Sequence, residues 1–334
     1  MDDQMHAKSL LAASPVGERQ MHMKNIFIKH DRFDDAWSFI RRAHYPVVGG
    51  AHDFGRIFVL AGESRAGKTS VAMRYMQSHP PTETDGGMLY PAVYVNVPID
   101  GLRALLEFIA EALGIKYSLR INNHALLSLI LNALRDQRVQ LLFFDELNTV
   151  VNADNRRALS YTLTLLRKLL DHAHLNIVCI GLEETYDLLA GDPQLTGRGG
   201  LPYQIVRPYS WDNAEERKLF RLLCHQFDKQ LPFEQMSGLQ DAWFAERLFY
   251  SSRGGVIGRL RDFIYSAGCI ALNEESHAIS GQHFAQAYEF IKARNTEFNP
   301  WVHDMANAPT PGVGNLELKG KSPREVFSKT KRAA

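Results

Sequence analysis

The stretch Arg56-Ile-Phe-Val-Leu-Ala-Gly62-Glu-Ser-Arg-Ala-Gly67-Lys68-Thr69 decides the fold class of this chain. A continuous apolar run, typical of a buried strand, leads directly into the pattern G-x-x-x-x-G-K-T, and a helical pattern follows at residues 70–77. The two glycines let the backbone close around an anion, so that amide groups of the loop and of the following helix point at phosphate oxygens. The sequence therefore predicts a phosphate-binding loop that holds a nucleoside triphosphate.

The residues of this loop have separate expected roles. The Lys68 ammonium would reach the β- and γ-phosphates of ATP, and the Thr69 hydroxyl would ligate Mg²⁺. An ordinary glycine-rich turn is the alternative, and the strand before the loop and the helix after it argue against that alternative. The full set expected to surround the nucleotide is Gly62, Glu63, Ser64, Arg65, Ala66, Gly67, Lys68, Thr69 and Ser70.

A second apolar strand, Leu141-Leu-Phe-Phe-Asp145-Glu146, ends in two acids. In a parallel sheet this strand places both carboxylates at the same edge as the phosphate-binding loop. We expect Asp145 to hold Mg²⁺, directly or through water, and Glu146 to polarise the water that attacks the γ-phosphate. The alternative is that the acids begin a solvated loop or cap the next helix. A kinase for small molecules activates a substrate hydroxyl and needs no such glutamate, so the acidic pair favours an ATP hydrolase.

Composition limits the class of protein. The chain has 334 residues, 45% hydrophobic and 22% charged, which is enough for one large or two modest domains. Its 38 Lys and Arg and 37 Asp and Glu leave a net charge of +1, so nucleic-acid binding would need a local basic surface. The three cysteines form no C-x-x-C pair, as in a cytosolic protein with reduced thiols. The sequence has neither a secretory h-region nor an apolar run of bilayer length, so we expect a cytoplasmic protein without a membrane partner.

The pattern along the chain predicts an α/β fold, a parallel sheet with helices on both faces, followed by a small helical domain. Further strands are expected at 92–97, 176–180 and 204–206, and helices between strands at 101–113, 125–136 and 158–172. After Pro208 only helical patterns follow, at 214–230, 241–251, 257–273 and 280–294. The expected division is an N-terminal extension (1–48), a nucleotide-binding subdomain (49–208), a helical lid (209–298) and a flexible tail (299–334). Within the extension, residues 1–20 are expected to be mobile or ordered only by a partner, and 25–42 to be helical.

This layout resembles the AAA+ ATPases and, more narrowly, the TnsC/TniB family of transposon regulators, over roughly residues 20–295. Besides the two motifs above, the resemblance rests on Ile177-Val-Cys-Ile-Gly-Leu-Glu-Glu, Asp192-Pro-Gln-Leu-Thr-Gly-Arg198 and Gly254-Gly-Val-Ile-Gly258-Arg-Leu. It implies an AAA+ ATPase that oligomerises with ATP on double-stranded DNA and links target-site selection to the transposase. The implied assembly is a ring or helical filament of six or seven subunits. The implied partners are a TniQ-like target-selection protein, sometimes joined to a CRISPR effector in this family, and the transposase.

The resemblance also implies further site residues. Arg198 matches the arginine finger that reaches the nucleotide of the neighbouring subunit; a surface arginine in a glycine-rich loop is the alternative. Arg259 matches the second sensor arginine, with Arg253 and Arg261 as competitors. One departure is Leu182, where relatives often carry a threonine after the fourth strand. Leucine cannot hydrogen-bond a phosphate, so hydrolysis is expected to be slow and switch-like, unless Glu183 or Asn148 fills the role.

In such an assembly the loops after the second strand face the central channel. Arg103, Lys116 and Arg120 flank these loops and could follow a DNA backbone without reading bases. A solvated helix rim is the alternative. For the whole chain, the alternatives are a helicase loader or initiator ATPase of the IstB or DnaC type, a small-molecule kinase, and a scaffold that binds ATP without hydrolysing it.

Overall fold

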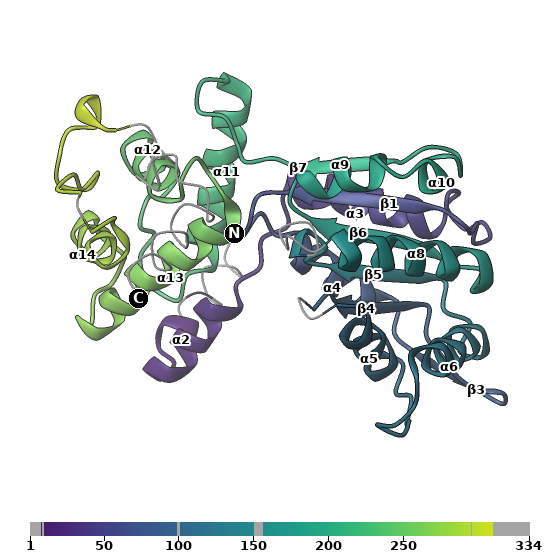
Figure 1. Cartoon of the computed structure of the whole chain (residues 1–334). Helices are drawn as coiled ribbons and strands as arrows, with labels where there is room; N and C mark the ends of the chain where they lie inside the picture. Colours follow the sequence, from purple (N-terminus) through teal and green to yellow (C-terminus); the bar gives the residue numbers. More distant parts are fainter. Residues whose placement is uncertain (1–7, 9, 99–100, 150–155, 295, 310–334) are drawn as a thin grey trace, which may run out of the picture. The chain divides into compact units, whose positions relative to one another are not determined.

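The computed structural model describes residues 8, 10–98, 101–149, 156–294 and 296–309. The chain divides into two compact units (Figure 1). Residues 29–208 form an α/β unit, and the described residues before 29 form a helical unit with those after 208. None of the helices in these described ranges is long and apolar enough to cross a bilayer.

The α/β unit is built on a five-stranded parallel sheet in the order β4-β5-β6-β1-β7. Its strands are β1 Ile57–Gly62, β4 Ala92–Asn96, β5 Leu141–Asp145, β6 Asn176–Gly181 and β7 Tyr203–Val206. The predicted α/β class and the predicted strands are confirmed. The hairpin of β2 Thr82–Thr84 and β3 Gly87–Leu89 was not predicted, because its largely exposed residues lack an alternating apolar pattern.

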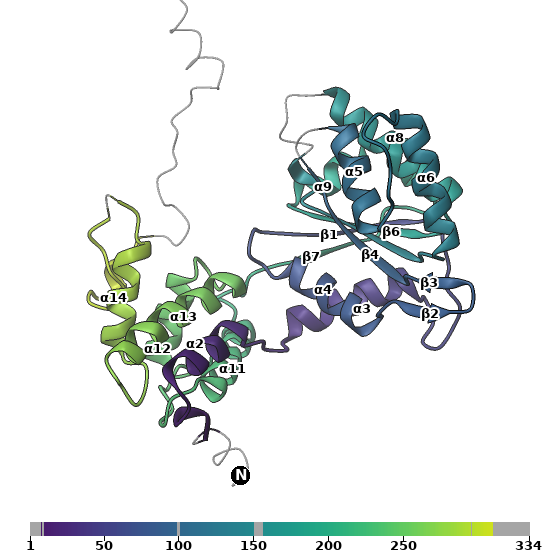
Figure 2. The same cartoon turned by 90° about the horizontal axis from the view of Figure 1, so that it is seen from below.

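Helices cover both faces of the sheet (Figure 2). One face carries α3 Asp31–His44 and α4 Lys68–Ser78; the other carries α5 Leu102–Ala112, α6 Asn123–Asp136, α8 Arg156–His172 and α9 Glu184–Ala190, followed by the short α10 Pro193–Thr196. Successive strand residues point to opposite faces of the sheet. The Phe58 ring contacts Phe39 of α3 on one face, and Val59 packs in the core with α5, α6 and α8 on the other. Because both faces are buried, the strands are apolar throughout rather than alternating.

The helical unit contains the four predicted helices, here α11 Ala214–Gln230, α12 Ala242–Ser251, α13 Ile257–Asn273 and α14 Gly281–Ile291. An additional helix, α2 Val16–Asn25, packs on α13. Met23 of α2 is almost fully buried, and its sulfur lies against Gly268 of α13. The segment expected to be mobile before residue 20 therefore leads into a docked helix, and part of the expected extension belongs to this unit.

The expected tail begins with an ordered segment. Trp301 is buried, stacks on Phe284 with ring centroids 4.4 Å apart, and donates a hydrogen bond from Nε1 to Ser251 Oγ at 3.0 Å. A short 3₁₀ helix, Met305–Asn307, follows. The helical core thus extends past residue 298. The reason is that the Trp301 indole buries a large apolar area, although it lies outside the periodic pattern of α14. The rest of the expected tail, from residue 310, lies outside the described residues.

Candidate nucleotide-binding and hydrolysis site

The phosphate-binding loop joins β1 to α4 in a conformation that depends on its glycines. Gly62 has φ +151°, and a Cβ there would lie 2.5 Å from the carbonyl oxygen of Val206, so only glycine fits. Gly67 caps α4 in the left-handed region, and Arg65 is also left-handed, with φ +72°. Glu63, Ser64, Thr69 and Ser70 are exposed along the loop and the first turn of α4, and Ala66 is buried beneath it.

Lys68 folds back under the loop that precedes it. Its side chain is buried, and Nζ donates hydrogen bonds to the carbonyl oxygens of Gly62 and Glu63, each at 2.8 Å. Burial lowers the pKa of this ammonium, and the negative charges of Asp145, Glu146 and Glu63 oppose that shift. The side chain is therefore held inside the loop, with three carboxylates nearby whose charges favour its protonated form.

Asp145 and Thr69 meet although 76 positions separate them in the chain. The Thr69 hydroxyl donates to Asp145 Oδ2 at 2.5 Å, and the Tyr94 hydroxyl donates to the same oxygen at 2.7 Å. Asp145 is 2% exposed, and its Oδ1 accepts the Glu146 backbone N–H at 2.8 Å. A hydroxyl beside a carboxylate offers the oxygen ligands that Mg²⁺ prefers, so these residues fit the expected ion.

The described residues hold no group of three or more His, Cys, Asp or Glu side chains suited to a metal ion. A Mg²⁺ ion at Thr69 and Asp145 would therefore complete its coordination with phosphate oxygens and water, as is usual for this ion. Sequence reasoning missed Tyr94. It lies on β4, in register with Phe143 of β5, two residues before Asp145, and no local motif marks it.

Glu146 differs from its neighbour in exposure and backbone. Its backbone is left-handed, with φ +59°, so the strand alternation breaks directly after Asp145. Glu146 is exposed, while Asp145 is buried. Asn148 Nδ2 donates a long hydrogen bond to Glu146 Oε2 at 3.5 Å. A solvent-accessible carboxylate beside a buried one can act on water while the other serves the ion.

Arg198 does not join these residues within its own chain. It follows α10 and pairs with Asp171, near the end of α8, where the chain is about to enter β6. Helix α8 connects the carboxyl end of β5 to the amino end of β6, so the end of α8 that carries Asp171 lies near the amino ends of the parallel strands. The phosphate-binding loop follows β1 and therefore lies at the opposite, carboxyl ends. Any contact between Arg198 and a nucleotide would thus involve another subunit.

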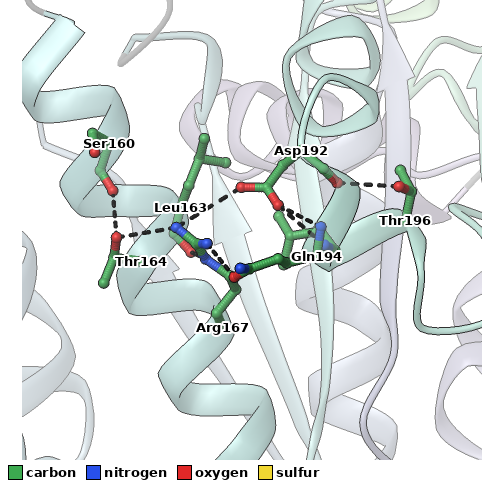
Figure 3. Close-up of polar contacts among 8 residues, drawn as sticks. Ser160, Leu163, Thr164, Arg167, Asp192, Gln194 and Thr196 are labelled. Carbon is green, nitrogen blue, oxygen red and sulfur yellow. Dashed lines mark hydrogen bonds and ion pairs between the residues drawn. The ribbon is translucent and has the colours of Figure 1, made fainter.

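A polar network fixes the segment that leads to Arg198 (Figure 3). Arg167 of α8 reaches across to α10, where it bonds to Gln194 and lies 3.9 Å from a carboxylate oxygen of Asp192. The Asp192 side chain in turn accepts the backbone N–H groups of Gln194 and Leu195 as the N-cap of α10. The loop that carries Arg198 is therefore tied to the body of the unit.

The three expected DNA-contact residues differ in their surroundings. Arg103 on α5 bonds to Glu107 at 2.7 Å and to the Ile121 carbonyl at 2.6 Å, and its guanidinium lies 5.9 Å from the Tyr117 ring centroid. It braces the loop between α5 and α6. Lys116 and Arg120 are exposed on that loop, so they are the better placed of the three to meet a phosphate backbone.

The expected second sensor, Arg259, lies in the first turn of α13 in the helical unit and is half-buried. Its competitor Arg261 pairs with Asp262, and Arg253 has a left-handed backbone. The assignment of Arg259 stays a prediction from the family resemblance.

The family model of the bacterial TniB protein matches residues 47–200. This segment, called the TniB region below, is similar to that family. The TniB region contains the phosphate-binding loop, both acids at the end of β5, and Arg198. Among curated protein sequences, none matches the chain.

Solved structures with the same fold include Cdc6p from Pyrobaculum aerophilum, with a TM-score of 0.55 and 15% identity over 81% of this chain and 70% of that one. The Aeropyrum pernix ORC2 protein in its ADPNP–ADP complexes gives a TM-score of 0.57 and 16% identity, over 80% of this chain and 70% of that one. The structure of Drosophila ORC bound to DNA gives a TM-score of 0.53 and 16% identity, over 84% of this chain and 67% of that one. At these identities the likeness concerns the fold alone, which is that of the AAA+ ATPases. In this chain the fold consists of the TniB region and a helical region that follows it.

Proposed function

We propose that this chain is an AAA+ ATPase that binds ATP with Mg²⁺, assembles with further copies of itself on double-stranded DNA, and links target-site selection to a transposase. The observation that carries the proposal is the convergence of Lys68, Thr69, Asp145 and Glu146 at one edge of the sheet inside a TniB region. A TniQ-like protein is the expected target-selection partner.

In the proposed reaction each residue has one task. The loop amides and the Lys68 ammonium bind the phosphates and offset their charge. When bound at Thr69 and Asp145, Mg²⁺ supplies further charge neutralisation of the phosphate oxygens. Glu146 orients the attacking water and accepts its proton, and Arg198 of a neighbouring copy stabilises charge on the γ-phosphate. Because two copies meet at each nucleotide, hydrolysis weakens the assembly and acts as a slow switch.

Assembly is the first expected result. With ATP and duplex DNA the purified chain should sediment as a six- or seven-subunit particle or larger, and electron microscopy should show rings or filaments. Without ATP it should sediment as much smaller species, because the phosphates join adjacent subunits. Lys68→Ala is the control, since it removes the buried ammonium and should stay small with ATP present. Single-chain particles under every condition would contradict the proposed function.

DNA binding should depend on Lys116 and Arg120. The variant Lys116→Ala/Arg120→Ala removes two exposed cations from the loop between α5 and α6. We expect weaker binding to duplexes of any sequence, and a slope of log K against log salt that is smaller by about two, near one per lost phosphate contact. Fluorescence anisotropy over a salt series measures both quantities.

The matched control is Lys168→Ala/Lys229→Ala, which removes two exposed lysines from helices α8 and α11 and changes the net charge equally. It should leave the slope near that of the unmodified chain. An equal loss of DNA affinity in both double variants would mean that overall charge, rather than the loop between α5 and α6, attracts DNA.

A further inference from the structure

Two buried polar side chains lie behind Glu146 with unpartnered atoms. Asn148 is 9% exposed and Thr185 is fully buried. Among the described residues, neither Asn148 Oδ1 nor Thr185 Oγ1 has a hydrogen-bond partner. Buried polar atoms without partners are rare in folded proteins, because water solvates them better in the unfolded chain, and they concentrate at functional sites.

The two unpartnered atoms border the same small space. A Cβ placed on Gly181 would lie 2.2 Å from Thr185 Oγ1 and 2.9 Å from Asn148 Oδ1. One atom is a hydroxyl that donates, and the other is an amide oxygen that accepts, so they are complementary. No hydrogen bond joins them as they stand, so a rotation of a side chain or one bridging water is needed to connect them. The space exists because residue 181 is glycine.

This space lies at the carboxyl edge of the sheet, between the two nucleotide-site strands. Gly181 ends β6 and is in register with Ala61 of β1, the residue before the phosphate-binding loop. On the other side, the Leu147 N–H donates to the Ile180 carbonyl at 3.1 Å, which anchors the turn carrying Glu146 against β6. The pair therefore sits where the loop and the acids approach each other.

Asn148 connects this space to Glu146. Its oxygen faces Gly181, and its Nδ2 lies 3.5 Å from Glu146 Oε2, at the long limit of a hydrogen bond. A small movement of either side chain converts that approach into a full bond. Glu146 is exposed and has a left-handed backbone, and within the described part of the chain its carboxylate accepts a side-chain hydrogen bond from Asn148 alone, so the direction of the carboxylate depends on Asn148.

We propose that Asn148 is a positioning residue for Glu146, and that the Thr185 hydroxyl supports it by donating to the Asn148 amide oxygen. The inference rests on the proposed ATPase function and deepens it. Donation from Thr185 fixes the amide orientation, so that the Asn148 N–H₂ group faces the carboxylate. In this proposal Asn148 and Thr185 provide the hydrogen-bonding groups that the half-buried Leu182, directly after β6, cannot provide. Because Thr185 belongs to α9, which contacts α10, Glu146 is linked to the segment that leads to Arg198.

Steady-state ATP hydrolysis and ATP affinity test the role of Asn148. Asn148→Ala should lower kcat by about tenfold to a hundredfold, with ATP affinity within about twofold of the unmodified chain, because misplacing a catalytic group by about 1 Å has an effect of that order. Asn148→Ala/Glu146→Gln should be no slower than Glu146→Gln alone, since Asn148 acts through Glu146. Additive losses, or an unchanged kcat for Asn148→Ala, would overturn the proposal.

Thr185 gives an independent test that separates positioning from packing. Thr185→Val keeps the shape of the side chain and removes the hydroxyl proposed to orient the Asn148 amide, so kcat should fall by about tenfold while ATP affinity stays within about twofold of the unmodified chain. Thr185→Ser keeps the hydroxyl and should retain kcat. If Asn148→Ala does not fold, the comparison of Thr185→Val with Thr185→Ser tests the proposal by itself. A lower Tm with unchanged kcat for Thr185→Val would show a structural role only.

These outcomes are distinct from failure of the proposed function. If the unmodified chain hydrolyses no ATP in the presence of duplex DNA, the ATPase proposal itself is wrong. If hydrolysis is present and lost in Glu146→Gln, but unaffected in the Asn148 and Thr185 variants, the function stands and this positioning role does not.

Discussion

Glu146→Gln is expected to lower the rate of ATP hydrolysis by about 10²- to 10⁴-fold while leaving ATP binding intact. The amide preserves the shape of the side chain but cannot accept a proton from water. The groups proposed to bind the phosphates, Lys68 and the loop amides, are untouched, as is the Thr69–Asp145 contact. Phosphate release measures hydrolysis, and a fluorescent ATP analogue measures affinity.

The same variant should trap the assembly. If hydrolysis separates the subunits, Glu146→Gln with ATP and duplex should form particles that outlast those of the unmodified chain, as sedimentation over time will show. Glu111→Gln is the matched control, because it alters an exposed acid on α5, outside the two nucleotide-site motifs, and should change neither the rate of hydrolysis nor the lifetime of the particles. Loss of nucleotide binding in Glu146→Gln would show that its assigned role is wrong.

Arg198→Ala should lower hydrolysis by about 10³-fold or more in the assembled state and have no effect on isolated subunits. The physical reason is its place in the fold. Arg198 pairs with Asp171 near the amino ends of the strands, so it cannot serve the nucleotide at the carboxyl ends in its own chain. The Arg198 side chain is 30% exposed, so part of it is open to an acceptor from outside its own chain. Hydrolysis measured against protein concentration, with duplex DNA present, separates the two states.

Two controls sharpen this experiment. Asp171→Asn weakens the pair within the chain but keeps Arg198, so the assembled rate should be retained. Arg56→Ala removes another arginine close to this loop, since Arg56 Nε lies 3.9 Å from the Cβ position of Gly199, and should also retain the rate. An equal loss for Arg198→Ala in dilute, unassembled protein would exclude action on a neighbouring subunit.

Local patterns were sufficient to predict the α/β fold and its strands. A run of apolar residues that ends in G-x-x-x-x-G-K-T has few alternatives, because only a buried strand followed by a glycine turn and a helix satisfies both the hydrophobicity and the required backbone angles. The apolar strand before Asp145 was predictable for the same reason, as both of its faces are covered.

Contacts between distant segments were not predictable in this way. Tyr94 reaches Asp145 only because β4 pairs with β5 in one particular register. Arg103 was predicted as one of three cations that could follow DNA, and only the packing of α5 shows that its guanidinium also bonds to the Ile121 carbonyl of the next loop. Trp301 was assigned to a flexible tail because a single tryptophan after a helix gives no periodic signal, although it completes the helical core.

The amino-acid sequence alone determined which residues could bind phosphate, hold a magnesium ion or activate water, since these roles depend on side-chain chemistry and on short-range backbone geometry. Tertiary structure alone decided which of them meet. It joined Thr69 to Asp145, set Arg198 against Asp171, and left Asn148 and Thr185 facing one small space beside Gly181. Strand order and helix packing bring these groups together across many residues, and no local pattern in the chain specifies that arrangement.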